Sequence, residues 1–550
     1  MGLGKTLQSL SLIVMEPNCC CLKASINLVI CKLSVLHQWK DEAKKFFPGT
    51  AALDVFIFYN SDNSASSWEE IIESTEESDD RATIVLTTYD QIREKYHKQS
   101  MKTPSAFMEH TFHRVICDEG HQIANATSST ALAISSLKAC HRWILSGSPY
   151  RNSPRDLYSL AVQFLRLQDS FLDEERFGRK ARWNRAFTRM DATRDFEESG
   201  VVPKFNLSPS SIRDEARVES WLNVLMLRRM QSDQEAQLPE RIHHEHTCAF
   251  ERGSHEEAIY EHVRSAVENF VLNIFDSGES FNFTSVHGGV MLLRRICVSI
   301  DLLLKDESDS TAMWTAKAGK RDDDGPIRHL TKHHVLQALP RNLKTFLGEH
   351  KQDKTKLTSK ISLVKLCLDK IIADAKREDL TASKVVVFSQ WSGVLDIAEQ
   401  LLEMFFANKF SILRIDGATS GKARASQCSS FNNDRNISYV LLLNYKAAGE
   451  GLNLQRGQHL LLVDPWFTPS VEDQAIARVY RQGNKNKRVH IHRFVIANSI
   501  EQRVQQISDR KRSESKRLLS MGLEHRSRMV QNTMDLSRNA ILELLGDKPK

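Results

Sequence analysis

Paired cysteines, long apolar runs and strong net charge are all missing from this sequence. The ten cysteines are scattered with no C-x-x-C pair, which argues against a zinc module or a disulfide framework and favours a reducing compartment. No apolar run reaches the roughly 18 residues that a spanning helix needs, so we expect no membrane-spanning segment and no membrane partner. The net charge is only +6, which permits a nucleic-acid partner without requiring one.

The chain does have the size and composition of a globular protein with several domains. It contains 550 residues, of which 41% are hydrophobic and 26% are charged. This length predicts about three or four structural units rather than one.

The first residues contain the end of a phosphate-binding loop. Gly2 and Gly4 would let the backbone approach phosphate groups closely, Lys5 would reach the β- and γ-phosphates, and Thr6 would hold Mg²⁺. The full G-x-x-x-x-G-K-[ST] pattern needs residues before Met1, so we expect the chain to start within the motif and to lack the strand that feeds it. The same residues also fit an N-myristoylation pattern, which keeps a lipid anchor open at this point.

Two adjacent carboxylates follow an apolar strand further along the chain. Asp118 and Glu119 come directly after the strand predicted at 114–117. In a nucleotide hydrolase, one carboxylate holds Mg²⁺ and the next activates the attacking water. A charged turn is the alternative, but the phosphate loop upstream favours the catalytic interpretation.

Apolar strands alternate with helical patterns in both halves of the chain, which predicts parallel βαβ units and an α/β fold with two lobes joined by helical material. An exposed acidic loop is expected at 61–80. The predicted units are a first lobe at 1–155, a helical extension at 156–240, a helical or irregular insertion and linker at 241–355, a second lobe at 356–500 and a basic helical segment at 501–550.

The second lobe contains two arginines spaced three residues apart, Arg478 and Arg481, which predicts that both project from one helical face. Two guanidinium groups on one face can clamp a transferring phosphoryl group. An exposed basic helix face is the alternative.

Small or aromatic residues follow other predicted strands. Ser146 and Ser148 can sense the phosphate state, or they can belong to a simple Gly-Pro turn. Gly449 and Gly451 permit a tight loop. Trp466 is expected either in the core or facing DNA.

Together these segments resemble the Swi/Snf family of helicase-like ATPases, within helicase superfamily two. The resemblance covers about residues 1–510 and makes the lipid anchor the weaker interpretation. Its segments, in order, are residues 2–6, Gln38-Trp39 with Glu42, 86–89, 118–121, 145–152, 227–229, 388–391, 414–417, 449–454, 464–469 and 474–483.

Gly120 stands where the family pattern has alanine, and this change, together with the segment 291–297, resembles the Rad-like repair branch. That branch often has a RING zinc module between its lobes. Only Cys248, Cys297 and Cys367 occur between residues 240 and 380, so we expect no RING module and no ubiquitin-ligase activity.

The resemblance implies two RecA-like lobes that hydrolyse ATP with Mg²⁺ and move along double-stranded DNA or chromatin in the nucleus, for chromatin remodelling or DNA repair. It implies catalytic roles for Lys5, Asp118, Glu119, Arg478 and Arg481, metal binding by Thr6 and Asp118, and nucleotide binding by Gly2, Gly4, Lys5, Thr6 and Gln474. Coupling to DNA is assigned to Thr88, Ser146, Ser148, Gly449, Gly451 and Trp466.

Two other functions are weighed against this one. A catalytically impaired, truncated DNA- or chromatin-binding fragment is the main alternative, because the expected nucleotide pocket lacks its first strand. An RNA helicase of the same superfamily is the other, and the Q-W-x-x-E, F-S-Q-W and D-P-W segments argue against it.

Overall fold

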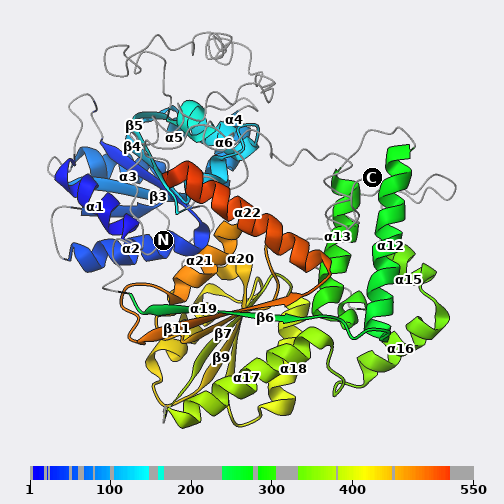
Figure 1. The fold of residues 1–550 in the computed structure, drawn as a ribbon. Coiled ribbons are helices and arrows are strands. Elements are labelled where there is room, and N and C mark those ends of the chain that lie inside the picture. The colour runs from blue at the N-terminus through cyan, green and yellow to red at the C-terminus, as the bar shows by residue number, and fades with distance from the viewer. Residues whose placement is uncertain are drawn as a thin grey trace. The chain divides into compact units, whose positions relative to one another are not determined.

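The computed structural model describes residues 4–17, 22, 25–48, 53–59, 67–77, 81–99, 105–147, 159–165, 238–276, 283–304, 332–378, 382–448 and 452–520. The chain divides into two compact units (Figure 1). Unit 1 consists mainly of Leu3–Arg229, and unit 2 mainly of Met230–Glu514. Each is described by itself below.

Unit 1 is built on a parallel sheet with the strand order β2-β3-β1-β4-β5. Its strands are β1 (Ile26–Cys31), β2 (Leu53–Ile57), β3 (Ala82–Thr88), β4 (Thr111–Asp118) and β5 (Lys138–Leu145). Its helices are α1 (Lys5–Met15), α2 (Leu33–Phe46), α3 (Trp68–Glu76), α4 (Tyr89–Gln99), α5 (Ala106–Glu109) and α6 (Ser129–Ser135), with short helical turns at η1 (Gly120–Ile123) and η2 (Ser159–Phe164).

The helices of unit 1 cover both faces of its sheet because side chains alternate along each strand. On one face, Val29 packs with Leu10 of α1 and Trp39 of α2. On the other face, Leu28 packs with Ile71 of α3, and residues of α4, α5 and α6 belong to the same cluster. Strands β1 and β3 are buried along their whole length, as expected for inner parallel strands.

Unit 2 contains a second parallel sheet, with the order β6-β11-β10-β7-β9-β8. Its strands are β6 (Glu240–Cys248), β7 (Lys384–Ser389), β8 (Ser411–Ile415), β9 (Tyr439–Asn444), β10 (His459–Leu462) and β11 (Arg488–Ile496). Its helices are α12 (His255–Asp276), α13 (Phe283–Val298), α15 (Lys332–Ala338), α16 (Arg341–Gln352), α17 (Ser359–Arg377), α18 (Ser392–Phe405), α19 (Gly421–Asn433), α20 (Tyr445–Ala448), α21 (Pro469–Val479) and α22 (Ile500–Ser520), with a turn at η7 (Ile300–Leu303).

Three hydrophobic clusters hold unit 2 together. Helices α17 and α18 pack on one face of the sheet, and α20 and α21 pack on the other. A third cluster joins α12, α13, α15 and α16 to the start of α22, where Ile500 and Val504 are buried. Helices α12, α13, α15 and α16 therefore form a layer with its own core.

The predicted fold class, α/β with two parallel sheets and helical insertions, is confirmed. The strands predicted at 26–31, 84–88, 384–388 and 440–443 are also present, as β1, β3, β7 and β9, whereas β2 and β6 were not predicted. Most of the predicted helical extension at 156–240 lies outside the described residues, and the predicted domain boundaries stay predictions.

Two local expectations were wrong. The segment 67–77, expected in an exposed loop, contains α3, because Trp68 and Ile71 bury one helical face and Ser67 forms a capping box with Glu70. The segment 240–248, placed mostly in the irregular insertion, is β6, which pairs along its whole length with β11. The strand was not predicted because its sequence is polar and its partner strand lies about 250 residues away in the chain.

Among the described helices, none combines the length and the apolar character needed to cross a bilayer.

Candidate active site

The predicted phosphate loop leads directly into a helix. Gly4 adopts a left-handed conformation, with φ of 71°, and serves as the N-cap of α1. Lys5 and Thr6 are the first two residues of that helix and are partly exposed. The N-terminal end of a helix presents unpaired backbone N–H groups and a partial positive charge, which is the arrangement that binds phosphate. Gly2 lies outside the described residues.

Asp118 and Glu119 lie at the carboxyl end of β4, an inner strand of the sheet. Asp118 is the last residue of the strand and is partly exposed. Glu119 has φ of 50°, a left-handed conformation that turns the chain sharply after the strand. Its amide donates a hydrogen bond of 3.0 Å to Asp118 Oδ1. The turn therefore presents two carboxylates at the sheet edge where ligands bind in open α/β folds.

Two aromatic side chains from other elements hold Asp118 in place. The Trp39 indole of α2 donates a 3.0 Å hydrogen bond to Asp118 Oδ2. The Tyr89 hydroxyl, at the start of α4, donates a 2.7 Å hydrogen bond to the main-chain oxygen of Asp118. Both residues lie in segments that match the family pattern, but no role was predicted for either of them. The available signal was that a buried Trp or Tyr must find a partner for its polar atom.

Opposing effects act on the ionisation of Asp118. Burial raises the pKa of its carboxyl, and the neighbouring Glu119 carboxylate raises it further. The hydrogen bond from Trp39 and the positive charge of Lys5 act in the opposite direction. Lys5 is therefore close enough to Asp118 for its charge to favour the ionised carboxylate.

The packing around Gly120 explains why glycine stands where the family pattern has alanine. A Cβ atom at this position would lie 2.7 Å from Cγ2 of Ile144 and 3.4 Å from Cβ of Cys117. The first distance is shorter than carbon atoms tolerate, and a β-branched side chain moves with difficulty. Packing of β5 against this turn therefore favours glycine.

The buried His121 links the carboxylate turn to the next strand. Its Nδ1 lies 3.3 Å from Glu119 Oε2 and 3.3 Å from Ser146 Oγ, just after β5. The structure thus brings the predicted coupling residue Ser146 next to the predicted catalytic pair. Ser148 lies outside the described residues.

Thr88 has a structural contact in this site. Its buried Oγ1 accepts a 3.2 Å hydrogen bond from the amide of Gln91 in the first turn of α4. The contact holds the start of α4, which also positions Tyr89. The predicted coupling role of Thr88 stays a prediction.

The residues present suit Mg²⁺ as the metal of this site. Mg²⁺ prefers hard oxygen ligands, and Asp118 and Thr6 offer a carboxylate and a hydroxyl. Each carboxylate oxygen of Asp118 accepts one protein hydrogen bond and has room for a second interaction. The donor set therefore fits the metal that the sequence implies.

The two predicted arginines of unit 2 do not share a helical face. Arg478 is in the last turn of α21, but the helix ends at Val479, so Arg481 lies beyond it. Beyond the helix, Asn484 donates a 2.9 Å hydrogen bond to the Val479 carbonyl, and Gly483 just before it has φ of 85°. The helical-face expectation was wrong because the spacing of arginines cannot show where a helix stops.

The glycine-rich segment of unit 2 meets the end of α21. The amide of Leu454 donates a 3.0 Å hydrogen bond to the carbonyl of Arg478, and Gln455 Nε2 donates one of 3.0 Å to the carbonyl of Gln482. Two segments of the family pattern are therefore joined by hydrogen bonds. Gly449 and Gly451 lie outside the described residues.

Gln474 and Trp466 are packed into unit 2. Gln474 lies on α21 with only 7% of its surface exposed. Trp466 is partly buried, and its ring meets Tyr445 edge-on with centroids 5.7 Å apart. The packing agrees with the core interpretation of Trp466, and its predicted DNA role stays untested, as does nucleotide binding by Gln474.

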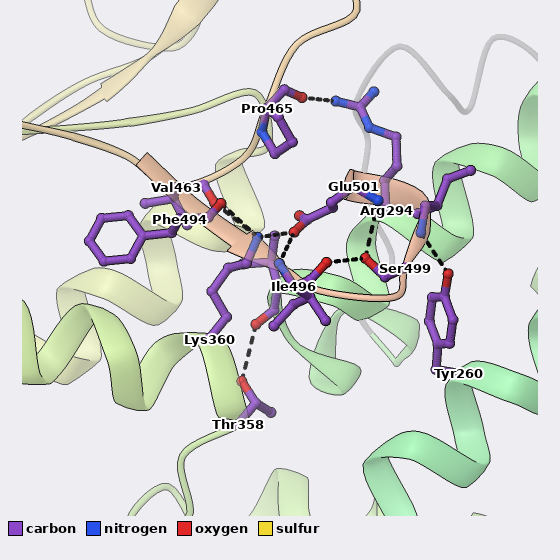
Figure 2. Close-up of polar contacts among 12 residues, drawn as sticks. Tyr260, Arg294, Thr358, Lys360, Val463, Pro465, Phe494, Ile496, Ser499 and Glu501 are labelled. Carbon is purple, nitrogen blue, oxygen red and sulfur yellow. Dashed lines mark hydrogen bonds and ion pairs between the residues drawn. The ribbon is translucent and has the colours of Figure 1, made fainter. Parts of the chain in front are cut away.

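A buried polar network supports the segment that follows β10 (Figure 2). Lys360 of α17 and Glu501 of α22 form an ion pair with no exposed surface on either side chain. Lys360 also donates to the main-chain oxygens of Val463 and Phe494, at 3.1 Å and 3.4 Å. Arg294 of α13 donates to the carbonyl of Pro465 and lies over the ring of Phe467. The network ties three helices to the ends of β10 and β11.

Comparisons with known families match both units. Residues 1–302 match the SNF2-related domain, and residues 364–483 match the helicase conserved C-terminal domain. The SWI2/SNF2 ATPase core of Sulfolobus solfataricus, solved in complex with dsDNA, is 22% identical, with 95% of this chain and 87% of that chain covered and a TM-score of 0.34.

Curated relatives match over most of this chain but only part of their own length. DNA repair protein RAD5 of Candida glabrata is 25% identical, covering 96% of this chain and 55% of the relative. DNA repair protein rad8 of Schizosaccharomyces pombe is 26% identical, covering 98% and 53%. Mouse helicase-like transcription factor is 26% identical, covering 88% and 50%. The chain thus spans about half the length of these relatives. Since a single family description matches more than half of the chain, the chain belongs to the family of proteins with an SNF2-related domain.

Proposed function

We propose that this chain is an ATP-dependent translocase on double-stranded DNA that acts in chromatin remodelling or DNA repair in the nucleus. The observation that carries the proposal is the arrangement at the carboxyl end of β4. There Asp118 is oriented by Trp39 and by the amide of Glu119, within the electrostatic reach of Lys5. The names of the relatives, several of them DNA repair proteins, support the choice of process.

Each residue has a distinct proposed role in ATP hydrolysis. Lys5 contacts the β- and γ-phosphates, beside the N–H groups that open α1. Asp118 and Thr6 hold Mg²⁺, which neutralises phosphate charge when bound. Glu119 accepts a proton from the attacking water. Arg478 and Arg481 stay the proposed contacts to the transferring phosphoryl group.

The test is ATP turnover by the full chain with and without duplex DNA. We expect turnover that duplex DNA stimulates and single-stranded RNA does not. Replacing the proposed base in Glu119→Gln should lower turnover by about a hundredfold or more. Lys5→Ala should lower it similarly, because the phosphate contact is lost.

Matched variants control for nonspecific effects of losing a charge. Glu73→Gln changes an exposed carboxylate on α3, and Lys44→Ala changes an exposed ammonium on α2. Both should keep normal turnover. DNA binding without turnover would instead support the catalytically impaired alternative, and stimulation by RNA alone would support an RNA helicase.

A further inference from the structure

Five histidines form a ladder on one face of the unit 2 sheet. They are His244 and His246 of β6, His459 of β10, and His490 and His492 of β11. The parallel register places His244 beside His492 and His459 beside His490. Their rings stack, with the centroids of His244 and His492 only 4.6 Å apart. Helix α17 packs on the same face and adds Cys367.

Three ligand atoms of this face converge on one point. His246 Nε2 lies 3.0 Å from His492 Nδ1. Cys367 Sγ lies 3.5 Å from His492 Nδ1 and 3.9 Å from His246 Nε2. In a triangle with these sides, the point equidistant from all three atoms is about 2.0 Å from each. Zn²⁺ binds nitrogen at about 2.0–2.1 Å and sulfur at about 2.3 Å, so the triangle needs little adjustment to hold it.

The surroundings of the three side chains also suit a metal. Cys367 and His492 are buried, with 5% and 6% of their surfaces exposed, whereas His246 is partly exposed and leaves an entry path. A neutral imidazole and a thiolate are the forms that bind a metal, so binding at Cys367 would release the thiol proton.

A further histidine orients the proposed ligand His492. Its second nitrogen, Nε2, lies 3.2 Å from His459 Nδ1. With Nδ1 on a metal, the Nε2–H group donates to His459, which is the supporting contact that ligating histidines commonly make. Charged groups also face the ladder from α17. Lys370 acts on His244 and His246, while Asp374 and Glu378 act on His490. A thiolate at Cys367 would offset the charge of Lys370.

We propose that His246, Cys367 and His492 form a binding site for Zn²⁺ or a similar borderline-soft divalent cation. The ion takes two nitrogens and one thiolate from the protein and leaves a fourth position for water. It links β6, the edge strand of the sheet, to β11 and to α17. Its role is therefore structural, since a strand with neighbours on only one side gains a cross-link on the face that α17 covers.

The test uses Co²⁺ as a spectroscopic probe on the full chain in reducing buffer. Thiolate ligation of Co²⁺ gives an intense charge-transfer absorption, which Mg²⁺-type oxygen sites do not produce. We expect this absorption to saturate at one equivalent of Co²⁺ and to disappear when Zn²⁺ is added. It should be absent in Cys367→Ser, and His246→Ala should bind Co²⁺ at least tenfold more weakly.

His243→Ala is the matched control, because His243 lies next to these residues on β6 but points to the opposite, exposed side. It should bind like the unchanged protein. If Cys367→Ser does not fold, His246→Ala decides the question, because that side chain is partly exposed. A chain without thiolate absorption, or one that keeps it in Cys367→Ser, overturns the proposal and leaves a ladder of hydrogen-bonded neutral imidazoles.

Discussion

Asp118 and Asp464 stand at matching places in the two sheets, each at or just beyond the carboxyl end of an inner parallel strand, but they have different surroundings. Asp118 is partly exposed and accepts hydrogen bonds from two neutral donors, the Trp39 indole and the Glu119 amide. Asp464 has no exposed surface, and its oxygens accept from the amide of Gln390. The cations Arg294 and Lys360 lower its pKa, but burial outweighs them and raises it to about 6.

Asp118 is therefore a carboxylate that is accessible to a ligand, whereas Asp464 is part of the core. Neutral donors orient Asp118 without neutralising it, which leaves its charge available to a metal ion. Asp464 lies inside the protein, where burial outweighs the hydrogen bonds from Ser389 and Gln390 and the charges of Arg294 and Lys360. The position of an aspartate in the sheet therefore does not decide its role; its exposure does.

The largest expected effect comes from removing a cation of the buried network near Asp464. Lys360→Met leaves Glu501 as a buried carboxylate without its ionic partner, so we expect unit 2 to lose about 3–5 kcal/mol in free energy of unfolding. Denaturant unfolding followed by tryptophan fluorescence measures this loss.

A double variant is the control for that prediction. Lys360→Met combined with Glu501→Met removes both charges, so it should recover much of the loss. A single variant that loses less than about 1 kcal/mol would contradict the assigned importance of the pair.

The second prediction concerns the pH dependence that Asp464 causes. Its pKa of about 6 in the folded state is above the ordinary value of 3.8. The protonated form is therefore favoured by folding, and this stability is present below about pH 4 and lost as the pH rises through 6. A shift of about two units corresponds to about 3 kcal/mol.

Asp464→Asn should remove this contribution. Between pH 4 and pH 7 the unchanged protein should lose about 3 kcal/mol more unfolding free energy than the variant. Asp473→Asn, an exposed change on α21, is the control and should keep the original slope. Equal slopes for Asp464→Asn and the unchanged protein would show that Asp464 is ionised throughout.

The third prediction concerns the packing of Gly120, which lies in the turn that follows Asp118. Gly120→Ala introduces a Cβ that meets Ile144 at 2.7 Å, so we expect a loss of about 2 kcal/mol in the unfolding free energy of unit 1. Gly348→Ala is the matched control, because nothing lies within 4 Å of a Cβ there and the position is helical. That control should be neutral or stabilising by up to about 1 kcal/mol. Equal effects of the two variants would refute the packing argument.

The smallest expected effect tests the neutral donor to Asp118. Trp39→Phe keeps a ring in the core but removes the hydrogen bond to Oδ2, so ATP turnover should fall by about tenfold, or about 1.4 kcal/mol, while the protein stays folded. Trp143→Phe, at an exposed position on β5, should leave turnover unchanged. Unchanged turnover in Trp39→Phe would mean that Asp118 needs no orientation from the indole.

The sequence predicted most of the fold because inner parallel strands are apolar along their whole length. Strands such as β1 and β9 appear as uninterrupted runs of buried residues. The edge strand β6 was missed because its sequence is polar, with three histidines and two glutamates. Helix α3 was missed because acidic residues outnumber the few apolar residues that bury it.

The candidate site was predictable in part. Lys5, Asp118 and Glu119 could be named because their motifs are contiguous in the chain. The supporting roles of Trp39 and Tyr89 could not, since they depend on contacts across 79 and 29 residues. The end of α21 at Val479, before Arg481, could not be predicted from the spacing of the two arginines either.

The sequence by itself determined the α/β class, most of the inner strands and the identity of the catalytic candidates, because each depends on residues that are neighbours along the chain. Only the tertiary structure decided which carboxylate is accessible and which is buried, because desolvation arises from packing. The same holds for His246, Cys367 and His492. Their separation in the chain follows no metal-binding spacing, and they meet only because β6 pairs with β11 beneath α17.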